Sequence, residues 1–162
     1  MLRAAVTLIF ALLAASTFAD DSQSQRIVPT CLPGVGQARR IRSGKLRYLV
    51  PKNAMVKQVK DIDYREYRVL LNHQGKWEAL TLFSGNGSPY STCSAAHHQA
   101  LELPDGTKGV DARCSSSTNR DVMQSRSTGF ENEYAYYDSV STESAGYFDK
   151  IIDSMCYDRN RK

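Results

Sequence analysis

The sequence predicts an α+β domain: a mainly antiparallel sheet of about five to six strands with a C-terminal amphipathic helix packed on one face, stabilised by disulfides. Three observations point to this class. Short β-prone runs alternate with turn-forming residues through the middle of the chain, and one apolar stripe with helical spacing closes it. Four cysteines follow an N-terminal leader, an even number that suits an oxidising compartment.

Residues 1–19 have the layout of a secretory signal peptide. Arg3 provides a positive start, an uncharged apolar run extends from Ala4 to Ala15, and Thr17-Phe18-Ala19 presents a cleavage position. The apolar run is too short for a permanent membrane anchor, and no second long apolar run follows. We therefore expect cleavage after Ala19 and a secreted or periplasmic mature protein without a transmembrane anchor.

Cleavage after Ala19 would leave 143 of the 162 residues, a length typical of one domain. Residues 20–44 read as an extended polar lead-in because prolines and glycines interrupt them, and residues 45–162 read as a single α+β domain. Positive charge gathers between Arg39 and Arg47. Two interpretations of this run stay open: a solvated segment that leads into the domain, or a patch for an acidic partner, an anionic lipid or a polyanion.

The first strands are predicted from short apolar or β-branched runs that end at turn residues. They cover Leu46–Val50 and Val56–Val59. The clearest hairpin joins Tyr67–Leu71 to Trp77–Phe83 through a turn at residues 72–75. Both faces of the second arm carry apolar side chains, so we expect Trp77–Phe83 to be a central strand covered on both sides.

A second hairpin joins Ala100–Leu103 to Gly109–Cys114 through a turn that contains Pro-Asp-Gly. Two more β-prone runs follow, at Asp121–Arg126 and Phe130–Asp138. They indicate either two strands or one strand bent around Gly129. The second run is rich in aromatic residues, which favours sheet surface and core.

The chain closes with a predicted helix from about Thr142 to Met155. Ser141 is a suitable N-cap, and Glu143 places negative charge in the first turn. The apolar stripe follows i, i+3, i+4, i+7 spacing and consists of Phe148, Ile151, Ile152 and Met155. The solvent-facing side is expected to carry Asp149, Lys150 and Asp153.

The four cysteines are Cys31, Cys93, Cys114 and Cys156, and three pairings are open. We favour Cys31–Cys156, which would tie both ends of the mature chain to the domain. Cys93–Cys114 would close the second hairpin region. With Leu103 opposite Lys108, Cys114 would face His97, so this bond requires the chain before His97 to fold back.

His97 and His98 are the weak candidates for catalysis, because histidine changes its charge near neutral pH. No motif of fixed geometry surrounds them, and adjacent residues on a strand point to opposite faces. The cysteines lack C-x-x-C spacing, and the acidic residues are scattered singly. We therefore expect no metal site and no cofactor.

The leading functional hypothesis is a non-enzymatic binding protein, for example of the inhibitor or immunity type. Its contact surface is expected in the Ser84–Ser94 loop, with Tyr90 as an aromatic anchor and with Asn86 and Trp77 as further contact residues. The partner would be another protein or an envelope component. The mature formal charge, 20 Lys or Arg against 17 Asp or Glu, does not indicate specific nucleic-acid binding.

Two alternatives from other classes remain. One is a small secreted hydrolase that uses His97 or His98, which requires one of these imidazoles to lie in a cleft within hydrogen-bond reach of a Ser or Asp. The other is a structural protein of the cell envelope bound through the Arg39–Arg47 run. The oligomeric state is left open.

Overall fold

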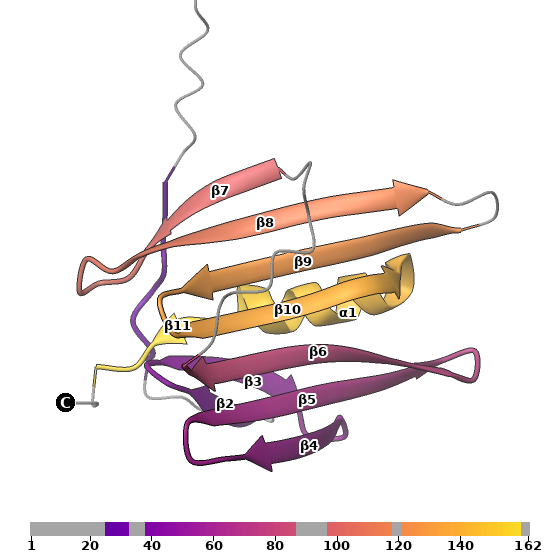
Figure 1. The fold of residues 1–162 in the computed structure, drawn as a ribbon, viewed down its shortest axis with the longest axis horizontal. Helices are drawn as coiled ribbons and strands as arrows, with labels where there is room; N and C mark the ends of the chain where they lie inside the picture. The colour runs from indigo at the N-terminus through magenta and orange to yellow at the C-terminus, as the bar shows by residue number, and fades with distance from the viewer. Residues whose placement is uncertain (1–24, 33–37, 87–96, 118–120, 160–162) are drawn as a thin grey trace, which may run out of the picture.

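The computed structural model describes residues 25–32, 38–86, 97–117 and 121–159. Within them, eleven strands and one helix form two sheets and a covering layer (Figure 1). In chain order the elements are β1 (Arg26–Ile27), β2 (Ala38–Ser43), β3 (Leu46–Pro51), β4 (Met55–Lys60), β5 (Tyr64–His73), β6 (Lys76–Gly85), β7 (His97–Glu102), β8 (Lys108–Ser117), β9 (Val122–Phe130), β10 (Glu133–Ser141), α1 (Thr142–Asp153) and β11 (Cys156–Tyr157).

The large sheet has eight strands in the order β1-β7-β8-β9-β10-β6-β5-β4, and the small sheet has three in the order β11-β3-β2. Neighbouring strands are antiparallel, except that β1 runs parallel to β7. Figure 1 shows α1 and the small sheet behind the same face of the large sheet. The mostly antiparallel sheet with one C-terminal helix confirms the predicted class in its coarse form.

The predicted number of five to six strands is wrong, because the described residues form eight strands in the large sheet alone. The predicted runs overlap β3 to β10, which is more than the total that was expected, and only β1, β2 and β11 have no predicted counterpart. β1 and β11 contain only two residues each, and β2 has the sequence ARRIRS, which reads as a polar, basic segment. In β2 the alternation buries Ile41 and Ser43 while the three arginines stay exposed, and β3 supplies the hydrogen-bonding partner.

The predicted strands differ from the observed ones mainly at their ends. The segments around Asp121–Arg126 and Phe130–Asp138 are two strands, β9 and β10, and not one bent strand. The turn between them lies at Glu131 and Asn132, and Gly129 pairs with Tyr134 inside the hairpin. The predicted turn or bend near Gly129 lies two residues too early, because a glycine inside a strand looks the same in sequence as a glycine in a turn.

β6 lies in the interior of the large sheet, between β5 and β10, as predicted for a central strand. On the face that carries α1, Leu80 and Leu82 are fully buried. On the opposite face Phe83 is 9 % exposed and stacks on Tyr134, with 4.5 Å between the ring centroids. Thr81 on that face is also buried, but Trp77 is 54 % exposed, so the face opposite α1 is covered over only part of the strand.

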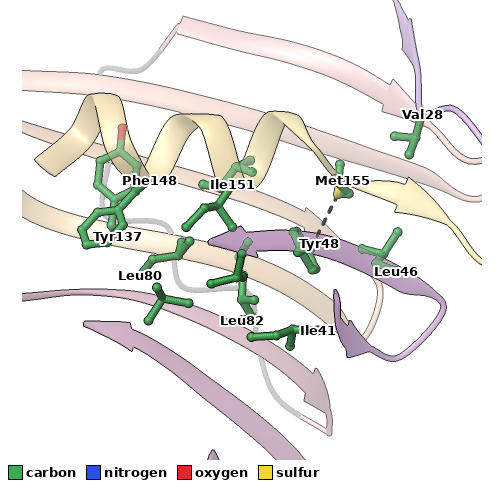
Figure 2. Packing of buried hydrophobic residues seen from close by; sticks show 14 of the residues in the cluster. Val28, Ile41, Leu46, Tyr48, Leu80, Leu82, Tyr137, Phe148, Ile151 and Met155 are labelled. Carbon is green, nitrogen blue, oxygen red and sulfur yellow. Dashed lines mark hydrogen bonds between the residues drawn. The ribbon is translucent and has the colours of Figure 1, made fainter. Parts of the chain in front are cut away.

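The C-terminal helix forms as predicted, although it ends at Asp153. Ser141 is the N-cap, and its side chain accepts a hydrogen bond from the Ser144 amide. The whole predicted stripe is buried: Phe148, Ile151, Ile152 and Met155. Figure 2 shows this stripe facing Leu80 and Leu82 of β6 and Tyr48 of β3, so α1 seals the core between the two sheets.

The Cys31–Cys156 disulfide is present, and it joins residues 125 positions apart. Cys114 is also disulfide-bonded. Cys93 lies outside the described residues, so the second pair stays a prediction. The expected hairpin register is wrong by one residue: Glu102 lies opposite Lys108, and His97 therefore faces Arg113.

Candidate functional site

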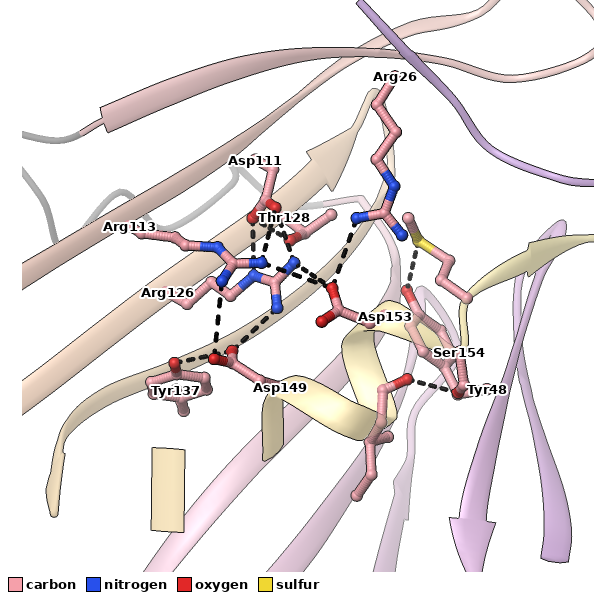
Figure 3. A network of polar contacts seen from close by, with 12 residues as sticks. Arg26, Tyr48, Asp111, Arg113, Arg126, Thr128, Tyr137, Asp149, Asp153 and Ser154 are labelled. Carbon is pink, nitrogen blue, oxygen red and sulfur yellow. Dashed lines mark hydrogen bonds and ion pairs between the residues drawn. The ribbon is translucent and has the colours of Figure 1, made fainter. Parts of the chain in front are cut away.

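The main cluster of buried charge surrounds Arg126 on β9 (Figure 3). This side chain is fully buried, and its guanidinium donates twice to Asp111 of β8, at 2.8 and 2.7 Å. It also donates to Asp149 at 2.9 Å and to Asp153 at 2.7 Å, both on α1. Arg126 thus connects two strands of the sheet to the helix above them.

Electrostatics favour the ionised forms of Asp111 and Asp153. Burial alone would raise the pKa of Asp111, but hydrogen bonds and attraction from Arg126 outweigh it and hold that pKa below its usual range. The pKa of Asp153 is lowered in the same way. Arg113 and Arg26 flank the cluster, at 3.5 and 3.4 Å from Asp153. Three arginines balance three aspartates, which suits a structural tie that fixes α1 on the sheet.

This arrangement corrects the expectation that Asp149 and Asp153 simply face solvent. Both lie at the border of α1, with 28 % and 45 % of their side chains exposed, and both reach back to Arg126. The sequence contains no local signal for this, because Asp111, Arg126 and the helix are brought together only by strand pairing.

Charge on the surface is divided between two parts of the molecule. Residues 38–68, which form β2, β3, β4 and the first half of β5, contain ten Lys or Arg and only three Asp or Glu. The other described residues contain seven Lys or Arg and twelve Asp or Glu. The first part has a formal charge of +7 and the second −5. Figure 1 shows that the basic strands β2 to β5 lie together on one side of the fold.

Part of the basic run between Arg39 and Arg47 is used inside the fold. Arg42 and Arg47 both bind Asp158, whose side chain is only 3 % exposed. Lys45 pairs with Asp105 at 3.1 Å. These pairs anchor the small sheet to the C-terminal segment and to the β7–β8 turn. This run is therefore not a continuous free patch.

Most free cations lie along β4 and the turns at its two ends; within the Arg39–Arg47 run, Arg39 and Arg40 are also exposed and form no ion pair with a described residue. We define the basic edge as residues 52–65 together with Arg39. Its cations are exposed and form no ion pair with another described residue: Arg39, Lys52, Lys57, Lys60 and Arg65. Arg39 is held at one end by a hydrogen bond to the Ala54 carbonyl.

Apolar side chains are exposed between these cations. Met55 and Val59 on β4 are 49 % and 41 % exposed, and Ile62 in the β4–β5 turn is 97 % exposed. Among described residues β4 pairs only with β5, so it forms one margin of the large sheet. The basic edge also contains two exposed carboxylates, Asp61 and Asp63, so its five cations leave a formal charge of +3 beside the projecting apolar groups.

A polar cleft of about 610 Å³ lies at the start of α1. Its charged and titratable lining residues are His73, Lys76, Glu78, Asp121 and Glu143. His73 Nδ1 lies 3.2 Å from Glu143 Oε2. Burial would raise the pKa of Glu78, but hydrogen bonds from the Ser141 amide and hydroxyl outweigh it and lower that pKa. These contacts join the β5–β6 hairpin to the helix start, and the cleft carries both signs of charge.

The predicted site residues do not gather at one place. His97 and His98 are exposed on β7 and pair with Arg113 and Ala112. Neither donates to or accepts from a described Ser or Asp, the contact that the hydrolase alternative needs. Trp77 is 54 % exposed at the start of β6, and Asn86 is exposed after its end. Tyr90 lies outside the described residues.

Two further properties of the described residues bear on function. No three His, Cys, Asp or Glu side chains in the described ranges are grouped so that they could hold a metal ion. No described helix has the length and apolar character that crossing a membrane requires. Comparison with protein-family models, with curated proteins and with solved structures finds no match.

Sequence reasoning missed the basic edge, although one signal was available. A count over the whole chain gives a small net charge and hides the division. A count in windows would have separated residues 38–68 from the rest. Which of those cations remain unpaired depends on the distant partners Asp105 and Asp158, and only the fold reveals them.

Proposed function

We propose that this chain is an exported, non-enzymatic binding protein that attaches to an acidic partner through the basic edge. The observation that carries this proposal is the division of charge, +7 over residues 38–68 against −5 over the other described residues. A surface with an excess of one sign of charge attracts partners of the opposite sign and orients them before contact.

The unpaired state of the edge cations supports this role. A lysine whose charge is neutralised by a neighbouring carboxylate contributes little to long-range attraction. Lys57, Lys60 and Arg65 have no such neighbour at ion-pair distance among described residues, whereas Arg42 and Arg47 share Asp158. Attraction to a partner should therefore concentrate at β4 and its turns, with Arg39 beside them, and not across the whole Arg39–Arg47 run, in which Arg42, Lys45 and Arg47 are paired.

The exported location is part of the proposal and rests on the leader and the cysteines. The first 19 residues have the layout of a signal peptide. The Cys31–Cys156 bond supports export because structural disulfides persist in oxidising compartments. The bond holds the N-terminal segment against β11, which pairs with β3 in the small sheet, whereas β4 lies in the other sheet beside β5.

Retention on immobilised heparin, a sulfated polyanion, tests the proposal. The mature chain should bind at low salt and elute as salt screens the charges. The double variant Lys57→Gln with Lys60→Gln should elute at clearly lower salt. The matched control Lys108→Gln with Lys150→Gln removes the same charge from the acidic part and should elute with the wild type. No retention of the wild type, or equal shifts for both variants, would contradict the proposal.

A further inference from the structure

The edge cations alternate with exposed apolar side chains, and this combination identifies the partner more closely. Along β4, Met55, Lys57 and Val59 share the sheet face opposite α1, since side chains alternate along a strand. Ile62 projects from the following turn. We propose that the acidic partner is the anionic surface of a phospholipid bilayer; this inference rests on the proposed function and names its partner.

Each kind of side chain matches one layer of such a surface. Lysine and arginine are attracted by the negative headgroups, and exposed apolar groups are buried at the boundary between headgroups and acyl chains. A polyanion such as a nucleic-acid backbone or a sulfated polysaccharide would use the cations alone. It would give no reason for Met55 and Val59 to be exposed on either side of Lys57, or for Ile62 to be 97 % exposed in the turn where Asp61 and Asp63 flank it.

Protection of the sheet margin explains only half of the pattern. Lysines on an edge strand discourage pairing with other chains, and Lys57 and Lys60 fit that purpose. Projecting Met55 and Val59 from the same strand has the opposite effect, because apolar edges promote association. A bilayer surface accounts for both sets of side chains at once.

The position of the edge also predicts an orientation. β4 is the last strand of the large sheet, with Lys57 on the face opposite α1 and Lys60 on the face that carries α1. Both lysines can reach headgroups together only if the sheet stands with this margin toward the membrane. The part of the molecule with the formal charge of −5, which includes α1, then lies away from the negative surface, which avoids repulsion.

Binding of the mature chain to vesicles tests the inference. Vesicles of equal parts phosphatidylglycerol and phosphatidylcholine should bind the protein, and vesicles of phosphatidylcholine alone should not. Each cation near an anionic surface changes partitioning about fivefold, so Lys57→Gln with Lys60→Gln should weaken binding roughly 20-fold. The control Lys108→Gln with Lys150→Gln should bind like the wild type.

A second variant separates the bilayer from a soluble polyanion. Met55→Ser, Val59→Ser and Ile62→Ser together should weaken vesicle binding by roughly tenfold, since apolar burial contributes to attachment, and should leave heparin retention unchanged. Heparin retention without vesicle binding would overturn the bilayer and leave the proposed function standing. If the wild type binds neither heparin nor vesicles, both the bilayer assignment and the proposed function are overturned. Equal vesicle binding by the wild type and by the apolar variant would also overturn the bilayer assignment.

Discussion

Replacing Arg126 by Met tests how the helix is held on the sheet. The guanidinium is fully buried and binds three aspartates. Its loss leaves Asp111, which is 2 % exposed, with the Thr128 hydroxyl at 2.7 Å and with Arg113 at 3.6 Å. Removing one partner of a buried ion pair costs about 3–5 kcal/mol, a large part of the 5–15 kcal/mol that stabilises a typical domain.

Urea unfolding followed by circular dichroism measures this loss, since Trp77 is too exposed to report on the core. Arg113→Met is the matched control, because the Arg113 side chain is 47 % exposed and its ion pairs should be worth only about 0–1 kcal/mol. Adding Asp111→Leu to Arg126→Met should restore most of the stability, because it removes the stranded charge. Equal losses for Arg126→Met and Arg113→Met would refute the reasoning.

Three further predictions concern the helix, acid stability and export. Ile152→Ala should lower the free energy of unfolding by about 2–5 kcal/mol and Lys150→Ala by about 0.5 kcal/mol, as compared by urea melts; equal losses would contradict the buried stripe. Because the pKa values of Asp111 and Asp153 are lowered in the fold, their contribution to stability should be complete above the unfolded carboxyl pKa, about 4, and be lost as pH falls through the folded values. Urea melts between pH 7 and pH 3 measure this, and stability that rises on acidification would speak against it. Intact-mass analysis of the exported protein should give an N-terminus at or near Asp20, and an uncleaved leader in that fraction would count against export.

The sequence predicts the elements whose signal is local. The helix is recognised because its cap and its apolar stripe lie close together in the sequence, within fifteen residues from Ser141 to Met155. The β5–β6 hairpin is recognised because its turn separates two β-prone runs. In both cases the apolar side chains that give the periodic signal in the sequence are also the side chains that pack against the core.

Elements that depend on a distant partner escape such reasoning. β2 is a strand because its backbone pairs with that of β3. Its three arginines alone would indicate a solvated segment. β1 and β11 are two residues long and exist only beside β7 and β3. Short strands contribute too few residues to produce a periodic signal.

The candidate site follows the same rule. The histidine pair drew attention because adjacent titratable residues are visible in sequence, and it lies exposed on β7. The basic edge is defined by what its cations lack, ion pairs with described residues, and that can be established only once Arg42, Lys45 and Arg47 have found their distant carboxylates. Sequence can count charges, but tertiary structure decides which of them are available to a partner.

The most direct test of the binding surface is the amide NMR spectrum of the mature chain during titration with bicelles of phosphatidylglycerol and phosphatidylcholine. The proposed attachment predicts that signals of residues 52–65 broaden or shift first, whereas those of α1 and β8 stay unchanged until much higher lipid concentration. The same bicelles without phosphatidylglycerol should leave the spectrum unchanged. Changes centred on α1 or β7, or an equal response to neutral lipid, would contradict the assignment of the basic edge as the surface that meets an acidic partner.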